Sequence, residues 1–530
     1  MAARGTADVS EPILIALDSG TSWVKALAFN PAGKVVTTAS RANAFSSGPG
    51  GVVEQDMIQT WDDTCAVLND VVARLDGAKV VALAVTGQGD GTWLIDERDN
   101  PVAPAILWLD ARAGQLVEEL RKTEAARSAF AFTGTGLAAC QQPAQLLWLD
   151  RNRPEVLKRA ATAFHCKDWL YLKLTGVRAT DPAEACFSYG DYRTRRYCKE
   201  VLDSLGLAHL RRLLPTMLDG TRKWHGLSAA AAARTGLVKG LPVVLGYLDL
   251  ACGALGAGAY GAGIEAGVSI LGTTGMHLRL VPEVDHVVPS AEMTGYCMPF
   301  PVPGYTLQMQ TNMAASLNLD WLASLVQDAA RLSEADASIE TGEILHILDR
   351  LVMEVRPGAL LFHPFISSSG ERGPFINPYA RAGILGIDQS VRLPQLARAV
   401  YDGLGLAARD CYIAMGGLPA GVRVTGGAAH SKSILVILAA CLNCPVSAAT
   451  YEETGATGAA MMAAVSIGLY RDMAECAARW IAGIEGETEH PDPNLTAVYE
   501  LLFPIYREGY EALPTVWRQL HAARQKIHGV

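Results

Sequence analysis

The stretch ILIALDSGTSWVKALAF, residues 13–29, carries the clearest structural signal in the chain. Two apolar runs rich in strand-forming residues flank the polar segment Asp18–Ser22. A glycine-bearing turn, Asn30–Gly33, then leads into Val35-Val36. Alternation of apolar runs with short polar turns predicts three antiparallel strands.

The first of these turns has the composition of a phosphate site. Its backbone N–H groups and the hydroxyls of Thr21 and Ser22 suit a phosphate, and Lys25 adds a cation. The carboxylate of Asp18 suits a magnesium ion beside that phosphate. An ordinary polar hairpin would contain the same residues, so the turn alone leaves both readings open.

A similar unit begins half a chain later. Residues 268–271 read as a strand, a Gly-Thr-Thr-Gly turn follows, and residues 276–280 read as the returning strand. The repetition predicts a duplicated α/β architecture whose two domains face each other across a cleft, where ligands usually bind. Thr273, Thr274 and Gly275 would form a second phosphate-binding turn, so that both domains hold one nucleotide.

The small residues Gly426, Gly427 and Ala428 lie between a predicted strand, 421–425, and a predicted helix, 434–442. Small residues allow an adenine ring or a phosphate to approach the backbone closely. A tight strand-to-helix turn without a ligand is the alternative reading.

Asp249 follows a predicted strand, 241–245, and precedes a small apolar helix, 250–255. A carboxylate in this position caps a helix in the simplest reading. It is also well placed to accept the proton of an attacking hydroxyl group.

Asp90 lies in the glycine-flanked loop that begins at Gln88, directly after a predicted strand. A short acid in such a loop can grip neighbouring hydroxyls, and Trp108 can stack on a carbohydrate. We therefore place Gln88, Asp90, Trp108 and Asp249 around a small hydroxylated substrate. Asp90 as a plain turn residue, and Asp110 with Arg112 as a structural ion pair, are the alternatives.

Composition limits the classes of function. The chain has 530 residues, 19% of them charged, with a net charge of -9. The length fits two large domains, and the acidic balance disfavours a nucleic-acid partner. We found no apolar run of membrane-spanning length, and we expect residues 1–11 to be a disordered leader. The glycine pattern at residues 256–261 follows a helix rather than a strand, which disfavours a dinucleotide site and a dehydrogenase.

Eleven cysteines, an odd number, are scattered along the chain and indicate reduced thiols in a cytoplasmic protein. Cys441 and Cys444 lack the further ligands of a zinc site and are expected to be core residues. The sequence leaves open whether the protein forms a homo-oligomer, and it assigns no role to the aromatic, basic segment 121–238.

Taken in order, these motifs resemble those of the FGGY carbohydrate kinases, a branch of the actin and hexokinase superfamily. The resemblance extends over the chain and rests on Asp18–Lys25, Glu54-Gln55-Asp56, Trp61, residues 167–181, Gly246–Asp249, Gly272–Gly275, residues 370–374 and Gly426–Ala428. It implies two actin-like (ribonuclease H-like) α/β domains, at 12–260 and 261–530, that face a central catalytic cleft.

The same resemblance implies ATP as the phosphoryl donor and Mg²⁺ as its partner. Asp249 would be the catalytic base, and Asp18 would hold the metal. The remaining ATP-binding positions implied are Thr21, Ser22, Lys25, Thr273, Thr274, Gly275, Gly426, Gly427 and Ala428.

Residues 86–96, 133–142 and 164–171 resemble the erythritol kinases of the family in particular. This implies phosphorylation of a terminal hydroxyl of a small linear polyol, with erythritol favoured over xylulose, ribitol or glycerol. Residues 250–253 depart from the β-branched run expected after the catalytic acid, which leaves the choice of polyol open. A non-catalytic, actin-like ATP-binding sugar sensor remains the alternative from another class.

Overall fold

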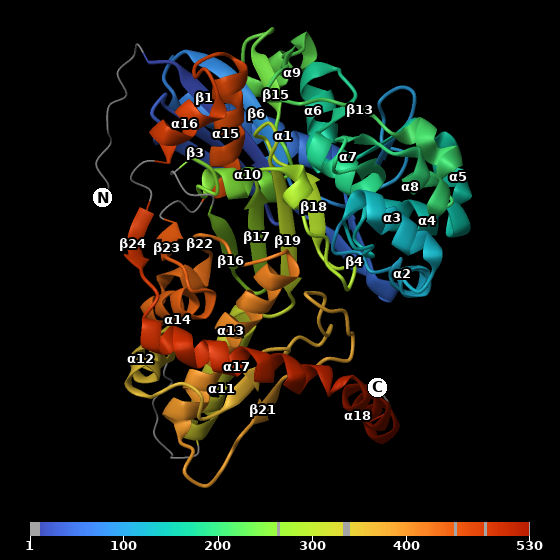
Figure 1. Ribbon diagram of the computed structural model, residues 1–530. Coiled ribbons are helices and arrows are strands. Elements are labelled where there is room, and N and C mark those ends of the chain that lie inside the picture. The colour runs from blue at the N-terminus through green and yellow to red at the C-terminus, as the bar shows by residue number, and fades with distance from the viewer. Residues whose placement is uncertain (1–10, 262–265, 332–339, 450–452, 482–484, 529–530) are drawn as a thin grey trace.

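The computed structural model describes residues 11–261, 266–331, 340–449, 453–481 and 485–528 (Figure 1). The expected leader therefore lies outside the described residues except for Glu11, and the expected domain boundary falls beside the gap at 262–265.

A six-stranded sheet forms the body in the upper part of Figure 1. In sheet order its strands are β14 (His225–Gly226), β15 (Pro242–Leu245), β6 (Val80–Gly87), β1 (Ile13–Ser19), β2 (Trp23–Phe29) and β3 (Val35–Ala42). β1, β2 and β3 pair antiparallel, which confirms the three strands predicted from sequence. β6 and β15 continue the sheet in parallel on the other side of β1.

The seven-stranded second sheet repeats this plan. Its order is β18 (Tyr296–Pro299), β19 (Thr306–Asn312), β17 (Gly275–Val281), β16 (Gly267–Leu271), β22 (Val422–Thr425), β23 (Val446–Ala449) and β24 (Glu485–Glu489). β16, β17 and β19 pair antiparallel, and β22 and β23 add in parallel beside β16. The duplicated architecture predicted from the two polar turns is therefore confirmed.

Both faces of β1 are buried because successive side chains of a strand point to opposite sides. The odd-numbered residues pack with α1 (Met57–Arg74) and α6 (Cys166–Thr175). The even-numbered ones pack with α10 (Asp249–Gly256) and α15 (Thr454–Ser466). The strand is thereby fixed from both sides, and the turn at its end is held in place.

α15 belongs to the later half of the sequence but packs on the first sheet and on α10. The crossing is close, because a Cβ on Gly458 would lie 1.9 Å from the carbonyl oxygen of Cys252. A Cβ on Gly256 would lie 2.1 Å from the carbonyl oxygen of Thr454. Small residues at these positions let the two helix backbones touch.

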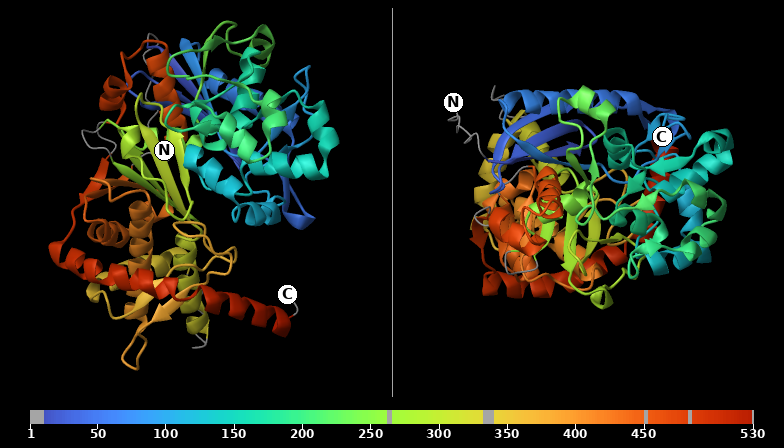
Figure 2. Two further views of the ribbon diagram at one scale, coloured as in Figure 1. Left: turned by 45° about the vertical axis from the view of Figure 1, so that its right-hand side comes forward. Right: turned by 90° about the horizontal axis from the view of Figure 1, so that it is seen from above.

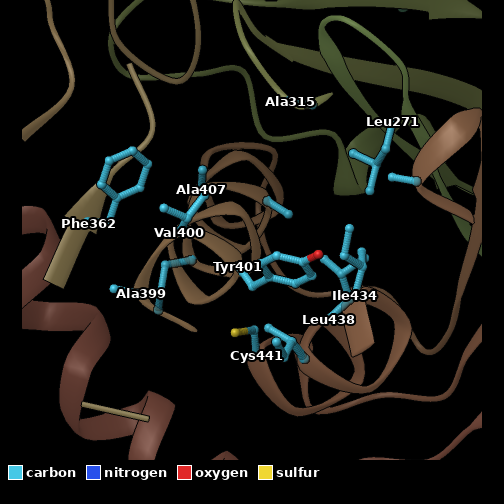
Figure 3. Close-up of a cluster of buried hydrophobic side chains, with 14 of the residues drawn as sticks. Leu271, Ala315, Phe362, Ala399, Val400, Tyr401, Ala407, Ile434, Leu438 and Cys441 are labelled. Atoms are coloured by element: carbon cyan, nitrogen blue, oxygen red, sulfur yellow. The ribbon is translucent and has the colours of Figure 1, made fainter. Parts of the chain in front are cut away.

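The second sheet is supported by α13 (Leu393–Ala414) and α14 (Lys432–Leu442). Figure 3 shows Tyr401 of α13 beside Ile434 and Leu438 of α14, within one buried apolar cluster. Leu271, the last residue of β16, belongs to the same cluster. The core thus supports the turn that follows Leu271.

Much of the segment 121–238 forms a helical body with a core of its own (Figures 1 and 2). Its helices include α3 (Glu124–Thr133), α4 (Gln142–Asn152), α7 (Pro182–Tyr189) and α8 (Lys199–Ser204). α7 also packs against β18 of the second sheet. The described helices include none with the length and apolarity needed to cross a lipid bilayer.

Candidate active site

Three parallel strands deliver the predicted acids to one edge of the first sheet. Asp18 lies near the carboxyl end of β1, opposite Thr86 of β6. Gln88 and Asp90 follow the end of β6, and Asp249 follows β15, whose Leu245 pairs with Val85. Carboxyl ends of neighbouring parallel strands share an edge, where ligands of α/β proteins usually bind.

Asp249 is the first residue of α10, but Leu248 occupies the N-cap position. Its Oδ1 accepts a hydrogen bond from the N–H of Leu250 at 2.7 Å. The side chain therefore bonds only the adjacent N–H rather than those two or three residues on, as a capping residue does.

Asp18 disfavours the charge of Asp249. Burial and the neighbouring Asp18 raise the pKa of Asp249 to about 8. Burial and Glu453 raise the pKa of Asp18 to about 6, although Lys25 opposes the rise. Buried carboxylates that share a site are typical of catalytic centres and of metal sites.

The amino end of α15 closes the site from the other half of the sequence. A Cβ on Gly455 would lie 2.7 Å from Oδ2 of Asp18. Next to it, Glu453 forms an ion pair of 2.7 Å with Lys25. Lys25, expected at a phosphate, therefore has a carboxylate partner in this structure.

Side-chain hydrogen bonds join three of the predicted residues. The Thr21 hydroxyl donates to Oε1 of Gln88 at 3.1 Å, and Nε1 of Trp108 donates to the Thr21 hydroxyl at 2.8 Å. Gln88 is buried and Nε2 of its side chain donates to Gln55, whereas Trp108 is 41% exposed. The first turn is thus coupled to the expected polyol side of the site, with an indole face open to solvent.

Asp90 has a left-handed backbone, with φ of 55°. Its Oδ2 accepts a hydrogen bond from the hydroxyl of Tyr296 at 2.8 Å, and Oδ1 is buried without a hydrogen-bond partner. Burial raises its pKa to about 6, although the bond from Tyr296 opposes the rise. Tyr296 lies on β18, so the second sheet contributes directly to this part of the site.

A buried charge cluster lies behind the Asp90 loop. Nζ of Lys167 lies 2.9 Å from Asp168, 2.6 Å from Asp181 and 3.3 Å from Glu184. Nδ1 of His165 lies 2.5 Å from Glu184. His165, Asp168 and Glu184 converge as metal ligands would, but both carboxylates already pair with the Lys167 ammonium.

Asp110 and Arg112 form the structural ion pair that was the alternative reading of their motif. Arg112 lies 2.9 Å from Asp110 and 2.9 Å from Glu54. Oδ2 of Asp110 accepts the N–H of Val53 at 2.7 Å, and both charged side chains are buried. They fix the loop that carries Trp108.

The second polar turn is fixed by the chain that follows β19. The carbonyl oxygens of Gly272 and Thr273 accept the N–H groups of Ser316 and Ala315, each at 2.9 Å. Thr273 is exposed and Thr274 half-exposed, whereas Gly275 is buried.

Gly426 directly follows β22 and lies against the start of this turn. It has φ of 87°, and a Cβ there would lie 2.7 Å from the carbonyl oxygen of Leu271. Gly426 and Gly427 are exposed and Ala428 is buried. The exposed residues of the two segments, Thr273 in the turn and Gly426 and Gly427 after β22, therefore lie on one surface.

Sequence reasoning missed Tyr296, Glu184, Glu453 and Gly455. The contacts of Tyr296 with Asp90 and of Glu453 with Lys25 span 206 and 428 residues. The run of Gly, Ala and Thr residues at 454–460 was the only available signal, since it indicates a closely packed helix.

Comparisons with known proteins agree with this geometry. Residues 13–256 match the N-terminal domain, and residues 267–467 the C-terminal domain, of the FGGY family of carbohydrate kinases. The chain is 48% identical to the erythritol kinase of Brucella abortus over 97% of this chain and 98% of that one. It is 28% identical to the xylulose kinase of Escherichia coli, covering 94% and 99% of the two chains.

Solved structures share the fold. The gluconate kinase of Lactobacillus acidophilus superposes with a TM-score of 0.85 at 22% identity, over 96% of this chain and all of that one. The xylulose kinase of Rhodospirillum rubrum superposes with a TM-score of 0.83 at 28% identity, again over 96% of this chain and all of that one. The chain therefore belongs to the FGGY family of carbohydrate kinases and is an ATP-dependent carbohydrate kinase with the two-domain fold of that family.

Proposed function

We propose that this kinase transfers the γ-phosphoryl group of ATP to a terminal hydroxyl of erythritol, with Asp249 as the general base. The observation that carries the proposal is the group of acids at one sheet edge, where Asp249 lies beside Asp18 and Asp90 keeps one oxygen without a partner. The 48% identity to an erythritol kinase over nearly the whole chain supports the choice of polyol.

In the proposed reaction, Asp249 accepts the proton of the attacking hydroxyl. The new bond forms between that oxygen and the γ-phosphorus, and the bond to the β–γ bridging oxygen breaks as ADP leaves. Asp90 and Gln88 orient the polyol, and the exposed indole of Trp108 forms one wall. Most of the rate enhancement of phosphoryl transfer comes from such positioning and from charge stabilisation.

Asp18 fits the magnesium site that the family implies. Its Oδ1 is buried without a hydrogen-bond partner, and carboxylate oxygens are the ligands that Mg²⁺ prefers. When bound there, the ion neutralises charge on the phosphates. We place the phosphates at Thr21, Ser22, Thr273, Thr274 and Gly275, and the nucleoside at Gly426, Gly427 and Ala428. Lys25 would turn from Glu453 toward a phosphate.

A panel of C3–C6 polyols and ketoses, ranked by kcat/KM with MgATP, tests the substrate. We expect erythritol to rank first. A higher value for xylulose, ribitol or glycerol would reassign the substrate within the family.

ATP binding without release of ADP in the presence of any panel member would favour the non-catalytic sensor. We also propose that the protein works in the cytoplasm, because all eleven cysteines are buried free thiols.

A further inference from the structure

Glu184 of α7 lies directly beneath the Asp90 loop. Its Oε1 accepts the backbone N–H of Asp90 at 3.0 Å. A Cβ on Gly89 would lie 2.9 Å from the same oxygen, so the loop backbone lies on the carboxylate. Glu184 itself is completely buried.

The loop needs such support because its backbone is unfavourable. Asp90 has φ of 55° and Gly91 has φ of 77°, so two consecutive residues are left-handed. A left-handed residue other than glycine is uncommon and persists where its surroundings hold it. The other supports are the bonds from Gln88 N–H to the Ser19 carbonyl at 2.9 Å and from Gly91 N–H to the Cys140 carbonyl at 3.0 Å.

The second oxygen of Glu184 faces cations. Oε2 lies 2.5 Å from Nδ1 of His165 and 3.3 Å from Nζ of Lys167. Although burial opposes its charge, Glu184 and Asp168 raise the pKa of His165 to about 9. Hydrogen bonds from an amide to a carboxylate are stronger than those to a neutral acceptor.

We propose that Glu184 is a positioning residue for the polyol, holding the Asp90 loop in the conformation that presents Oδ1 of Asp90 to a substrate hydroxyl. This inference rests on the proposed function, since it assumes that Asp90 binds the polyol. It gives the buried charge cluster around Lys167 a role, which is to hold one carboxylate acceptor under the Asp90 loop.

Steady-state kinetics of Glu184→Ala and Glu184→Gln test the proposal. The alanine variant leaves the N–H of Asp90 without its acceptor, which destabilises the loop conformation. We expect the KM for erythritol to rise about tenfold or more, since about 1.4 kcal/mol corresponds to a factor of ten. The KM for MgATP and kcat should stay within about threefold, and the glutamine variant, which keeps an acceptor, should recover most of the loss.

Asp181→Asn is the matched control. Asp181 binds the same Lys167 ammonium at 2.6 Å, but its side chain caps α7 through Ala183 and Glu184 N–H rather than the Asp90 loop. Asparagine preserves the cap. We expect this variant to lower the melting temperature while leaving the KM for erythritol within about twofold.

A double variant provides the sharpest readout. If Glu184 acts through Asp90, Glu184→Ala should add little to the KM of Asp90→Ala, because the two changes remove one interaction. An unchanged KM in Glu184→Ala, or fully additive effects, would overturn the inference. ADP binding and the melting temperature show that each variant is folded.

The wild-type rate with erythritol tests the proposed function separately. If another polyol or ketose is the better substrate, the same KM ratios are measured with that compound. The two proposals can therefore fail independently.

Discussion

As the proposed base, Asp249 would have to meet two demands that oppose each other. A base must lose its proton, yet burial and Asp18 hold the pKa of Asp249 at about 8 in the ligand-free protein. A cation at Asp18 would reverse the repulsion and favour the ionised base. The side chain is therefore unfavourable for the free protein and useful once the nucleotide and metal are bound, as is common for catalytic groups.

Asp249→Asn should lower kcat by at least about 10²-fold, the usual minimum contribution of a general base. ADP binding should remain within about threefold, because the amide has almost the same shape. A coupled assay for ADP release and calorimetric titration with ADP measure the two quantities. Near wild-type turnover would remove Asp249 from the role of base.

The same substitution should stabilise the free protein in a pH-dependent way. Between the ordinary pKa of an aspartate, 3.8, and its folded value of about 8, the folded state keeps a proton that the unfolded state loses. Stability then decreases with pH by at most about 1.4 kcal/mol per unit through that window. The melting temperature of Asp249→Asn should therefore match wild type near pH 4 and exceed it increasingly up to pH 8. An equal difference at both pH values would contradict the raised pKa.

At the residue scale, the sequence predicted the acids but not their partners. Asp18, Asp90 and Asp249 each follow a recognisable strand, so their meeting at one sheet edge could be expected. Tyr296 and Glu184 could not be assigned, because an aromatic residue in a strand and an acid in a helix are ordinary there. Only the folded chain brings them to Asp90.

The elements were predictable where a turn separates two apolar runs. α1 begins at Met57 because the side chain of Asp56 caps it through the N–H groups of Ile58 and Gln59. What the sequence did not reveal is that α15 crosses back onto α10, because helix pairing depends on a contact between residues about 200 positions apart. The site at Asp18 needs that crossing, which brings Gly455 to the carboxylate.

The crossing of α10 and α15 gives a prediction at the scale of elements. Gly256→Ala would place a Cβ 2.1 Å from the Thr454 carbonyl, so the helices must separate. Overpacking of this kind usually costs about 1–3 kcal/mol. Gly253→Ala, on the same helix, would meet only Thr454 Oγ1 at 3.6 Å and should be neutral or stabilising by up to about 1 kcal/mol. Chemical denaturation of both variants measures the difference, and equal stabilities would contradict a tight crossing.

At the scale of the whole molecule, duplication places one polar turn in each half, and we propose that the two turns hold one nucleotide. The first turn and Asp18 belong to one sheet, and the second turn with Gly426 belongs to the other. The repeated strand–turn–strand pattern was enough to predict this plan. It was not enough to predict the shared core, because α15 returns to the first sheet from the second half.

A nucleotide held by both halves should stabilise the whole chain as one unit. Ligand at about 100 times its Kd adds about 2.7 kcal/mol to the free energy of unfolding. We expect ADP with Mg²⁺ to raise the melting temperature of wild type more than ADP with a chelator. In Asp18→Asn the two increments should become equal, because the carboxylate that we assign to the metal is gone. Gly253→Ala serves as the control, since it should keep the magnesium-dependent increment. A magnesium effect that persists in Asp18→Asn would move the metal site away from Asp18.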